Sequence, residues 1–480
     1  MASRFISALA GVAKFLPAAS KPSQKPSLRE KFAWTGLALL AFLVMASTPL
    51  YGIPSQLSNQ FNIQNLIFAS RQGTLMQLGI GPIVTAGMIM QILVGSKILD
   101  VDLSDPQGRI DFTAAQKSFA VIFTLIEAAA YVGAGIFGSL TLPQEVLVFL
   151  QLVFATLLVI LLDEMLQKGW GIGSGISLFI LAGVAFQVVN AAFSFQPYNL
   201  TGVKPVYAYG AIIAAVQAAL NGHFLSSVIR YPAVAGSIPP PDLVGLAATI
   251  AFVLILAYMQ GMKVEIPVVY QKAQGYKSKI PLQFLYVSNV PVLLAGILFS
   301  DYIFFTQIVW SKFDPNNNVW YLNFLGTYTR TASGIQPSGG IAWYLQNPGG
   351  LGATIEQPIR SLVFVVLLIV LSVMFSYMWV EIAGLGPRDQ AEQLSASGLQ
   401  IAGFRSSVGI IEAVLRKPIY ALTFLSALAA GLIAGVADLL GAYGTGIGLL
   451  LAVSITYQIY QILVQEQIEE LYPGIARLLE

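Results

Sequence analysis

Ten long stretches of this chain carry almost no charge, and no other feature limits its possible folds as strongly. They cover residues 32–51, 73–96, 115–138, 143–165, 171–192, 242–262, 284–307, 358–380, 417–436 and 443–464. A helix needs about 20 consecutive apolar residues to cross a bilayer. In lipid, only helices and closed barrels satisfy every backbone N–H and C=O group. The chain is therefore predicted to be an all-α polytopic membrane protein with ten transmembrane helices.

The composition excludes several kinds of chemistry. Charged residues make up 10% of the chain and the net charge is +2, so no strong field favours nucleic acid. Cysteine is absent, which excludes disulfides, thiol catalysis and Cys-ligated metal. The single histidine, His223, argues against a His-based metal site or triad. No metalloprotease HExxH, intramembrane-protease GxGD or phosphate-binding GxxxxGK[ST] motif occurs. We therefore expect no enzymatic activity, no cofactor and no metal.

The distribution of Lys and Arg predicts the topology. With a cytoplasmic N-terminus, 19 of the 25 Lys and Arg residues fall on the cytoplasmic side, as the positive-inside rule requires. Residues 206–222 are apolar enough to suggest an eleventh span, but a crossing there would reduce the bias to 14 against 11. We expect that segment outside, as an interfacial or packed helix, and both termini in the cytoplasm. Residues 1–31 are expected to hold an amphipathic helix at the membrane surface, with a disordered tail as the alternative.

Two landmarks recur in register along the chain. The second span contains "PIVTAG" (82–87) and the seventh "PVLLAG" (291–296), while "GIGSG" (171–175) precedes the fifth span and "GAYGTG" (441–446) the tenth. Five is an odd number, so the second set of five spans must enter from the opposite side, as an inverted repeat. The predicted domains are a first half (32–192), an outer loop (193–241), a second half (242–464) with cytoplasmic loops 263–283 and 381–417, and a cytoplasmic tail (465–480).

The glycines at the head of the fifth span need a reason, because glycine costs about 1 kcal/mol relative to alanine inside a helix. We interpret them as sites where helices of the two halves approach closely. Between them, Ile172 and Ile176 are four residues apart and would share one helix face. Ile80 and Val84 have the same spacing. The aliphatic residues would then line a narrow space, and the alternative is close helix packing without a pore.

A short segment follows the first span, "PSQLSNQFNIQNLIF" (54–68), and it has no charge. It is too short and too polar to span. Non-spanning backbone at membrane depth is tolerated only inside protein or beside a water-filled cavity. The segment is therefore either a half-helix that enters a cavity or an ordinary outer loop.

Five stretches resemble the SecY family, the large subunits of the protein-conducting channel, in its archaeal and eukaryotic branch. They are "ASRQGTLMQLGIGPIVTAGMIMQILVGS" (69–96), "GIGSGISLFI" (171–180), "MKVEIPV" (262–268), "YVSNVPVLLA" (286–295) and "AGFR" (402–405). The resemblance covers residues 28–475. It implies a channel that passes unfolded polypeptides and releases transmembrane segments laterally into lipid, in an archaeal plasma membrane. Implied partners are a SecE/gamma-type clamp subunit, a small beta-type subunit, the ribosome with its RNA, signal sequences, nascent chains and membrane lipid.

The resemblance also assigns site residues. The pore ring falls on Ile80, Val84, Ile172, Ile176, Leu293 and Leu451, with Leu450 as the alternative to Leu451. The plug corresponds to residues 54–68, including Pro54, Leu57, Phe61, Ile63 and Leu66. The lateral gate falls on Thr85, Glu127 and Asn289. Ribosome docking falls on Lys263, Lys272, Lys277, Lys279, Arg405, Arg416 and Lys417.

Some of these assignments have simpler alternatives. Thr85, Glu127 and Asn289 interrupt apolar spans, where polar groups usually face protein or water, and each could form a structural hydrogen bond only. Glu127 is expected to be nearly the only ionisable residue within a span, which disfavours a secondary transporter, the alternative function. The basic loops could reflect the positive-inside bias alone. Lys272 stands where the family usually has arginine, and lysine lacks the bidentate fork. The long outer loops 193–241 and 308–357 predict no function.

Overall fold

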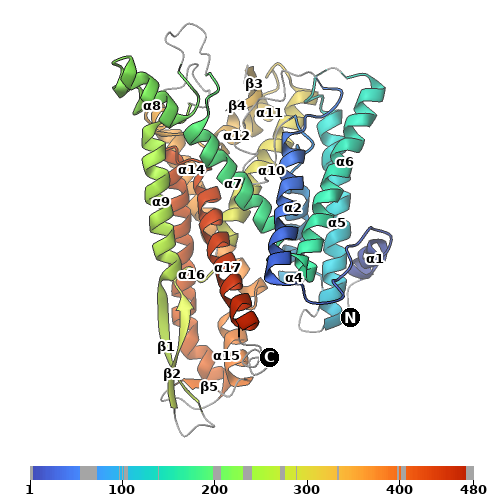
Figure 1. Ribbon diagram of the computed structural model, residues 1–480, viewed down its shortest axis with the longest axis vertical. Helices are drawn as coiled ribbons and strands as arrows, with labels where there is room; N and C mark the ends of the chain where they lie inside the picture. Colours follow the sequence, from blue (N-terminus) through green and yellow to red (C-terminus); the bar gives the residue numbers. More distant parts are fainter. Residues whose placement is uncertain are drawn as a thin grey trace.

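The structure is a computed structural model that describes residues 4–53, 73–96, 98–99, 101, 106–138, 140–197, 207–230, 240–270, 276–287, 289–331, 334–396, 399–401 and 407–471. Within these ranges, nine helices are long and apolar enough to cross a membrane. Their lengths and the pairing of the halves described below establish a mostly helical polytopic membrane protein, with two small sheets outside the long helices. The two halves stand side by side in Figure 1.

The first half contains helices α2, α4, α5, α6 and α7. Their bounds are Leu28–Ser47, Gly81–Gly95, Pro106–Gly133, Leu142–Met165 and Gly175–Phe193, and a π-helical turn η2 (Leu166–Trp170) extends α6. A capping box begins α2, in which Ser27 and Glu30 each satisfy a backbone N–H of the other. The expected second span 73–96 is helical only from Gly81, because Pro82 lacks a backbone N–H and favours the first turn of a helix. At 15 residues, α4 is shorter than a full span.

The second half contains helices α9, α10, α14, α16 and α17. Their bounds are Leu243–Gly261, Val290–Phe313, Pro358–Ile382, Val408–Leu439 and Gly446–Leu471. The linker between the halves forms α8 (Ala211–Leu220) and a short 3-10 helix η3 (Phe224–Ser227). Ten residues of helix extend only about 15 Å, so α8 does not cross the membrane, as expected.

A cytoplasmic extension stands below the second half in Figure 1. The two predicted loops 263–283 and 381–417 form one antiparallel sheet of order β2-β1-β5, with bounds Lys263–Tyr270 (β1), Tyr276–Gln283 (β2) and Leu399–Ile401 (β5). Lys263 pairs with Gln283, and Val268 with Ile401. Helix α16 begins at Val408, not at 417 as expected, because Ser407 caps it and its first turns pack on α15 (Pro387–Ala396).

The outer loop 308–357 is a structured cap. It contains α11 (Trp320–Leu325), β3 (Thr327–Thr331), β4 (Gly334–Gly339), α12 (Gly340–Leu345) and α13 (Leu351–Glu356). The side chain of Tyr328 on β3 is buried, and its hydroxyl donates to the Ile303 carbonyl of α10 at 2.9 Å. The buried Tyr328 therefore fixes the cap to the outer end of α10.

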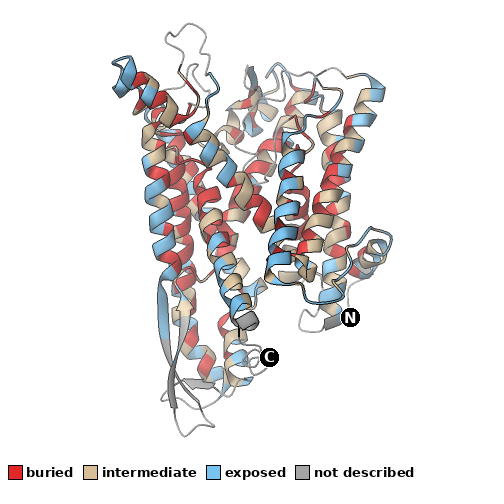
Figure 2. Ribbon diagram, in the orientation of Figure 1, coloured by how far each residue is buried: buried red, intermediate tan, exposed pale blue. Residues whose placement is uncertain are grey.

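The largest core lies between the halves. Buried apolar residues of α2, α4 and α7 form one cluster with residues of α9, α10, α14, α16 and α17. Figure 2 shows buried residues along the inward faces and exposed residues along the outward faces of these helices. Exposing apolar side chains to lipid has no free-energy cost. Burial inside this molecule therefore shows where helices contact one another, and it does not show which residues are more hydrophobic.

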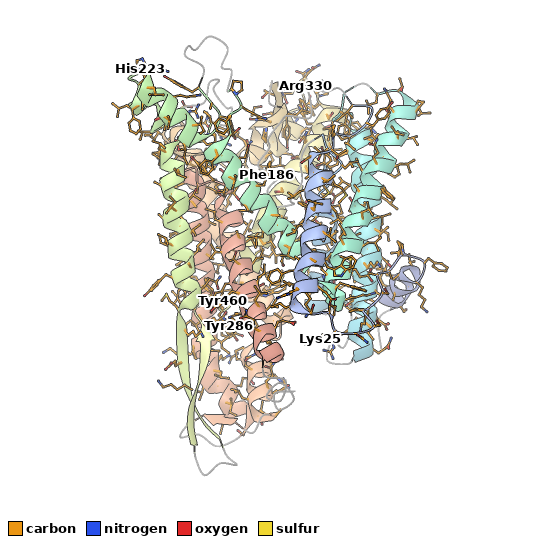
Figure 3. The ribbon with its side chains drawn as sticks, viewed as in Figure 1. Lys25, Phe186, His223, Tyr286, Arg330 and Tyr460 are labelled. Atoms are coloured by element: carbon orange, nitrogen blue, oxygen red, sulfur yellow. The ribbon has the colours of Figure 1, made fainter. Side chains whose placement is uncertain are left out.

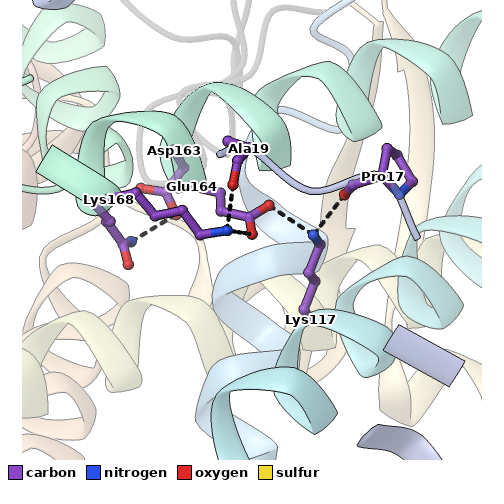
Figure 4. Close-up of polar contacts among 7 residues, drawn as sticks. Pro17, Ala19, Lys117, Asp163, Glu164 and Lys168 are labelled. Carbon is purple, nitrogen blue, oxygen red and sulfur yellow. Dashed lines mark hydrogen bonds and ion pairs between the residues drawn. The ribbon is translucent and has the colours of Figure 1, made fainter. Parts of the chain in front are cut away.

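The N-terminal segment belongs to the first half. Helix α1 (Arg4–Ala13) buries Ile6 and Leu9 against Met90 of α4 and Ala115 of α5. Two lysines then hold the following residues, as Figure 4 shows: Lys117 Nζ donates to the Pro17 carbonyl at 2.7 Å and Lys168 Nζ to that of Ala19. Residues 4–13 are helical and pack on the first half, and the position of this helix at the membrane surface stays a prediction.

Candidate functional site

The second helices of the two halves begin with the same local structure. Ile80 precedes α4 with φ −94° and ψ 1°, and Asn289 precedes α10 with φ −96° and ψ −6°. Proline follows two residues later in both. The N–H of Val84 donates to the Ile80 carbonyl and the N–H of Leu293 to the Asn289 carbonyl, each at 3.0 Å. The matching helix starts confirm the repeat that "PIVTAG" and "PVLLAG" predicted.

The fifth helices of the halves also begin alike, through a contact that the sequence did not reveal. Asp163 at the end of α6 accepts the N–H of Ile176 at 3.0 Å. Asp438 at the end of α16 accepts the N–H of Gly446 at 2.8 Å. Each fifth helix is thus capped by an aspartate of the helix before it. A carboxylate at a helix N-terminus satisfies free backbone donors and interacts favourably with the helix dipole.

These caps explain some of the glycines, and for those they correct our interpretation. A Cβ on Gly175 would lie 2.7 Å from Asp163 Cα, and one on Gly446 would lie 1.9 Å from the Ala434 carbonyl oxygen. A Cβ on Gly171 would lie 2.1 Å from Leu166. These three glycines approach a helix of their own half, because the tight turn between the fourth and fifth helices brings those helices together. A Cβ on Gly173 or Gly444, in contrast, would lie 3.5 Å from Ile462 or 3.0 Å from Val184 of the opposite half.

The predicted shared face of Ile172 and Ile176 is also wrong. Helix α7 begins at Gly175, and Gly173 has a φ of +70°, so Ile172 lies in the turn before the helix. Its N–H donates to Thr35 Oγ1 of α2 at 3.0 Å. The Ile172 side chain is nevertheless buried, with 4% exposure.

Five of the six predicted ring residues pack in a single apolar cluster. They are Ile80, Val84, Ile176, Leu293 and Leu451, and Leu450 belongs to the cluster as well. Helices α4 and α7 of one half and α10 and α17 of the other contribute them. Ile80 is fully buried, while Val84, Ile176 and Leu293 are partly buried. Leu450 and Leu451 are both buried, so their burial does not decide between them.

An acidic residue that we did not predict lies at the seam between α4, α5 and α10. The hydroxyl of Thr85 on α4 donates to Asp301 Oδ2 on α10 at 3.4 Å. Glu127 on α5 interacts electrostatically with the same carboxylate. Glu127 is therefore not nearly the only ionisable residue within a span. Glu127 was selected because it is an ionisable residue inside an apolar stretch. The same criterion applied to residues 284–307 would have found Asp301.

Asn289 has other partners. Its Nδ2 donates to the Leu450 carbonyl of α17 at 3.3 Å, and its buried Oδ1 has no hydrogen-bond partner in the described part of the chain. Twelve residues of helix, roughly 18 Å, separate Asn289 from Asp301. The structure thus brings Thr85 and Glu127 together through Asp301, and it places Asn289 beside the apolar cluster.

The predicted plug residues Pro54, Leu57, Phe61, Ile63 and Leu66 lie outside the described residues. The chain on either side of them is tied together. The N–H of Leu50 donates to the Gly73 carbonyl and the N–H of Leu75 to the Thr48 carbonyl, both at 3.0 Å. The described residues on either side of this segment therefore lie close together, between α2 and α4.

The predicted docking residues are spread over the cytoplasmic extension. Lys263 and Lys279 are exposed on the β1–β2 hairpin, where Lys279 pairs with Glu265. Arg416 and Lys417 are exposed on α16. Lys277 lies on β2, and Lys272 and Arg405 lie outside the described residues. Because β5 pairs with β1, the sheet joins the two basic loops. Near the base of the sheet, the part-buried hydroxyl of Tyr286 donates to the Leu385 carbonyl at 2.7 Å, and partial burial raises the pKa of Tyr286 to about 12.

Comparisons with known proteins agree over the whole chain. The SecY family model matches residues 74–460, and the model for the plug domain of Sec61p matches residues 40–73. The protein translocase subunit SecY of Aeropyrum pernix is 45% identical, over 99% of this chain and 98% of the relative. A solved structure of a protein conducting channel superposes with a TM-score of 0.78 and 35% identity, covering 97% of this chain and 98% of the other. Sec61 in the canine ribosome-channel complex superposes with a TM-score of 0.76 and 35% identity, with the same coverage.

Proposed function

This chain belongs to the SecY family, and from that premise we propose how its residues carry out the work of a protein-conducting channel. The protein is the channel subunit of a translocase in an archaeal plasma membrane, and it is not an enzyme. It passes unfolded polypeptides across the membrane and releases transmembrane segments into lipid. The observation that supports the assignment of residues is the apolar cluster to which both halves contribute equivalent helices. Membership in this family leaves no support for the secondary-transporter alternative.

The constriction is assigned to the aliphatic residues at the meeting point of the halves. They are Ile80, Val84, Ile172, Ile176, Leu293 and Leu451. A narrow ring of aliphatic side chains excludes water and therefore ions. It also offers a moving polypeptide no hydrogen bonds or charges that would hold it. Partly buried members such as Leu293 can turn aside when a chain passes, because side chains change rotamer faster than helices move.

The plug and the lateral gate complete this assignment. Residues 54–68 form the plug, and the backbone bonds between Thr48 and Leu75 and between Leu50 and Gly73 support it, because they return the chain to one place. The lateral gate lies between α4–α5 and α10–α14. Thr85, Glu127 and Asn289 are its predicted residues, and we add Asp301, since it contacts the first of them.

The partners follow the family. A SecE/gamma-type clamp subunit and a small beta-type subunit complete the channel, and the ribosome supplies nascent chains and signal sequences. The cytoplasmic sheet and α16 present the docking lysines and arginines to ribosomal RNA. Phosphate contacts of this kind weaken as salt rises. Lys279 contributes less than Lys263, because Glu265 already neutralises it.

Site-specific crosslinking of a stalled nascent chain tests the path. A photoreactive amino acid at Ile80, Ile172 or Asn289 should react with the translocating polypeptide. Leu254 on α9, whose side chain is exposed to lipid, is the matched control and should not react. Equal yields at Ile80 and Leu254 would contradict the assigned path while leaving membership in the family intact.

Conductance tests the seal. Changing Ile80, Ile172 and Leu293 together to Ser introduces hydroxyls that wet the constriction, so bilayers containing the complex should pass ions at rest. A triple change to Ser at the lipid-exposed Ile250, Leu254 and Val366 is the control for general damage to the fold. If the ring variant leaks no more than that control, these residues do not form the barrier.

A further inference from the structure

The linker between the halves presents an apolar surface that is exposed among the residues the structure describes. Val216 and Leu220 of α8 and Phe224 and Leu225 next to it are exposed, and Leu220 and Leu225 have 83% and 85% of their surface accessible. In Figure 3 the labelled His223 marks this corner of the molecule, above Phe186 on α7. Single exposed apolar residues are ordinary, but a group on one side of a short segment requires an explanation.

The opposite side of α8 is packed on the protein. Ala211, Ala214, Ala215 and Ala218 recur at helical spacing and are buried. Ala211 belongs to a cluster with Ala192 of α7, Leu246 of α9 and Tyr443. The helix therefore rests on the outer ends of α7 and α9 through small side chains and Ile212, while Val216 and Leu220 point away.

Charge is absent from this surface. Residues 207–229 contain no Asp, Glu, Lys or Arg. Arg230, which follows, turns its guanidinium inward to the carbonyls of Ala208, Tyr209 and Pro241. An outer loop in water would be expected to carry charges on its exposed side, and a surface for a charged partner would offer a complementary group.

The apolar surface continues that of the transmembrane helices. Next to α8, the exposed residues Val189 and Phe193 of α7 and Ile250 and Leu254 of α9 face outward. These helices meet lipid over their exposed faces, and α8 contacts both of them at their outer ends. A ten-residue apolar helix at that level is too short to cross the bilayer and long enough to lie in its interface.

We propose that α8 and η3 form an outer-leaflet membrane anchor, in which Val216, Leu220, Phe224 and Leu225 insert into the boundary between lipid headgroups and acyl chains. The linker that joins the two halves is thereby fixed to the bilayer as well as to the protein. The partner is the lipid surface itself, and no specific headgroup is required, because the segment offers no charge to recognise one.

Fluorescence quenching tests this anchor directly, and the natural absence of cysteine makes the labelling clean. Single variants Leu220→Cys and Leu225→Cys carry an environment-sensitive dye in the complex reconstituted into phosphatidylcholine vesicles. The controls are Thr329→Cys, exposed on the outer β3 strand, and Leu254→Cys, exposed to lipid on α9. The quenchers are aqueous iodide, lipid with a spin label near the headgroup, and lipid with a spin label deep in the acyl chain.

The anchor predicts that both linker dyes are quenched several-fold more by the shallow lipid label than by iodide. Leu254→Cys should respond most to the deep label, and Thr329→Cys to iodide. If the linker dyes respond as Thr329→Cys does, the segment lies in water and the proposal is wrong. If they are shielded from iodide and from both lipid labels, a channel subunit covers the surface, and the proposal is wrong as well.

Discussion

The two halves meet along two seams, and different parts of the chain cross each. On the side of α7 and α17, the backbone at Gly444, just before α17, packs directly on the side chain of Val184 of α7. A Cβ on Gly444 would lie 3.0 Å from Val184 Cγ1. On the side of α4–α5 and α10–α14, the contact is a hydrogen bond of 3.4 Å between Thr85 and Asp301, next to Glu127. The first seam also holds the side-chain pair of Lys31 and Glu466, at its cytoplasmic end. The second seam is joined at membrane depth by polar side chains.

The second seam is also closed at both ends, by an aromatic pair at one end and by a close glycine contact, like that at the first seam, at the other. At the outer end, Tyr131 of α5 stacks on Phe304 of α10 with ring centroids 4.6 Å apart. At the cytoplasmic end, Ile382 of α14 lies against Gly95 of α4. We infer that the α7–α17 seam acts as the hinge of the channel and that the other seam opens. A seam in which the backbone itself is closely packed resists separation, because any opening removes those packing contacts.

The largest effect is expected from a change that wedges the hinge seam. Gly444→Val should destabilise the complex by roughly 2–5 kcal/mol, since valine is strained at a positive φ and its side chain overlaps Val184. Thermal unfolding of the purified complex measures this. Gly444 has a φ of +83°, and Gly138, with a φ of +85°, has open space around its Cβ position, so Gly138→Val is the matched control.

The control separates the destabilisation caused by overlap with Val184 from that caused by backbone strain alone. Gly138→Val should cost only about 1–2 kcal/mol, because it has the strain without the overlap. Adding Val184→Ala to Gly444→Val should recover part of the difference. If the two glycine variants are equally stable, the hinge seam is not tightly packed at Gly444, and the contrast between the seams fails there.

Local patterns made much of this fold predictable. The apolar runs predicted the helices, and two recurring motifs predicted the inverted halves, because proline and glycine constrain the backbone at their own positions. The caps by Asp163 and Asp438 were not predictable in this way, since they depend on how two helices turn in space. The start of α7 after Ile172 follows from the same turn. The cytoplasmic sheet pairs β1 with β5 across more than a hundred residues, where no local signal exists.

The candidate site was predictable to a different degree. The aliphatic ring residues could be assigned from motifs that resemble the family, and five of them do pack together. Asp301 was visible in the sequence as an acidic residue within an apolar run, yet its partner Thr85 is more than two hundred residues away. The spacing of residues shows that an ionisable group is present in a span, and only the fold shows what it contacts.

A change at the opening seam is expected to have an intermediate effect. In the closed state, Glu127 and Asp301 place two acidic groups close together at membrane depth, which disfavours closure. Glu127→Leu should therefore favour the closed seam and raise the hydrophobicity that a segment needs to enter lipid, by about 1 kcal/mol or roughly fivefold in the insertion ratio. A graded series of test segments measures that threshold.

The isosteric Glu127→Gln removes the ionisable group and keeps the hydrogen-bonding groups, so it should shift the threshold less than Glu127→Leu does. Asp301→Asn should act in the same direction as Glu127→Gln. A threshold that stays at its natural value in all three variants would mean that this seam does not set the entry of segments into lipid.

The smallest effect concerns the one charged contact on the hinge side that joins the halves in the part of the chain the structure describes. Lys31 of α2 pairs with Glu466 of α17, and their side chains are 8% and 22% exposed. Partly buried pairs are less screened by salt than exposed ones.

A double-mutant cycle with Lys31→Gln and Glu466→Gln should therefore give a coupling energy of about 1 kcal/mol that persists in high salt. The Lys279–Glu265 pair, 67% and 55% exposed, should give about half as much and lose it with salt. If the two pairs have equal coupling energies, the cytoplasmic end of the hinge seam is as open to water as the β1–β2 hairpin. The hinge seam would then differ from the opening seam only in its glycine contacts.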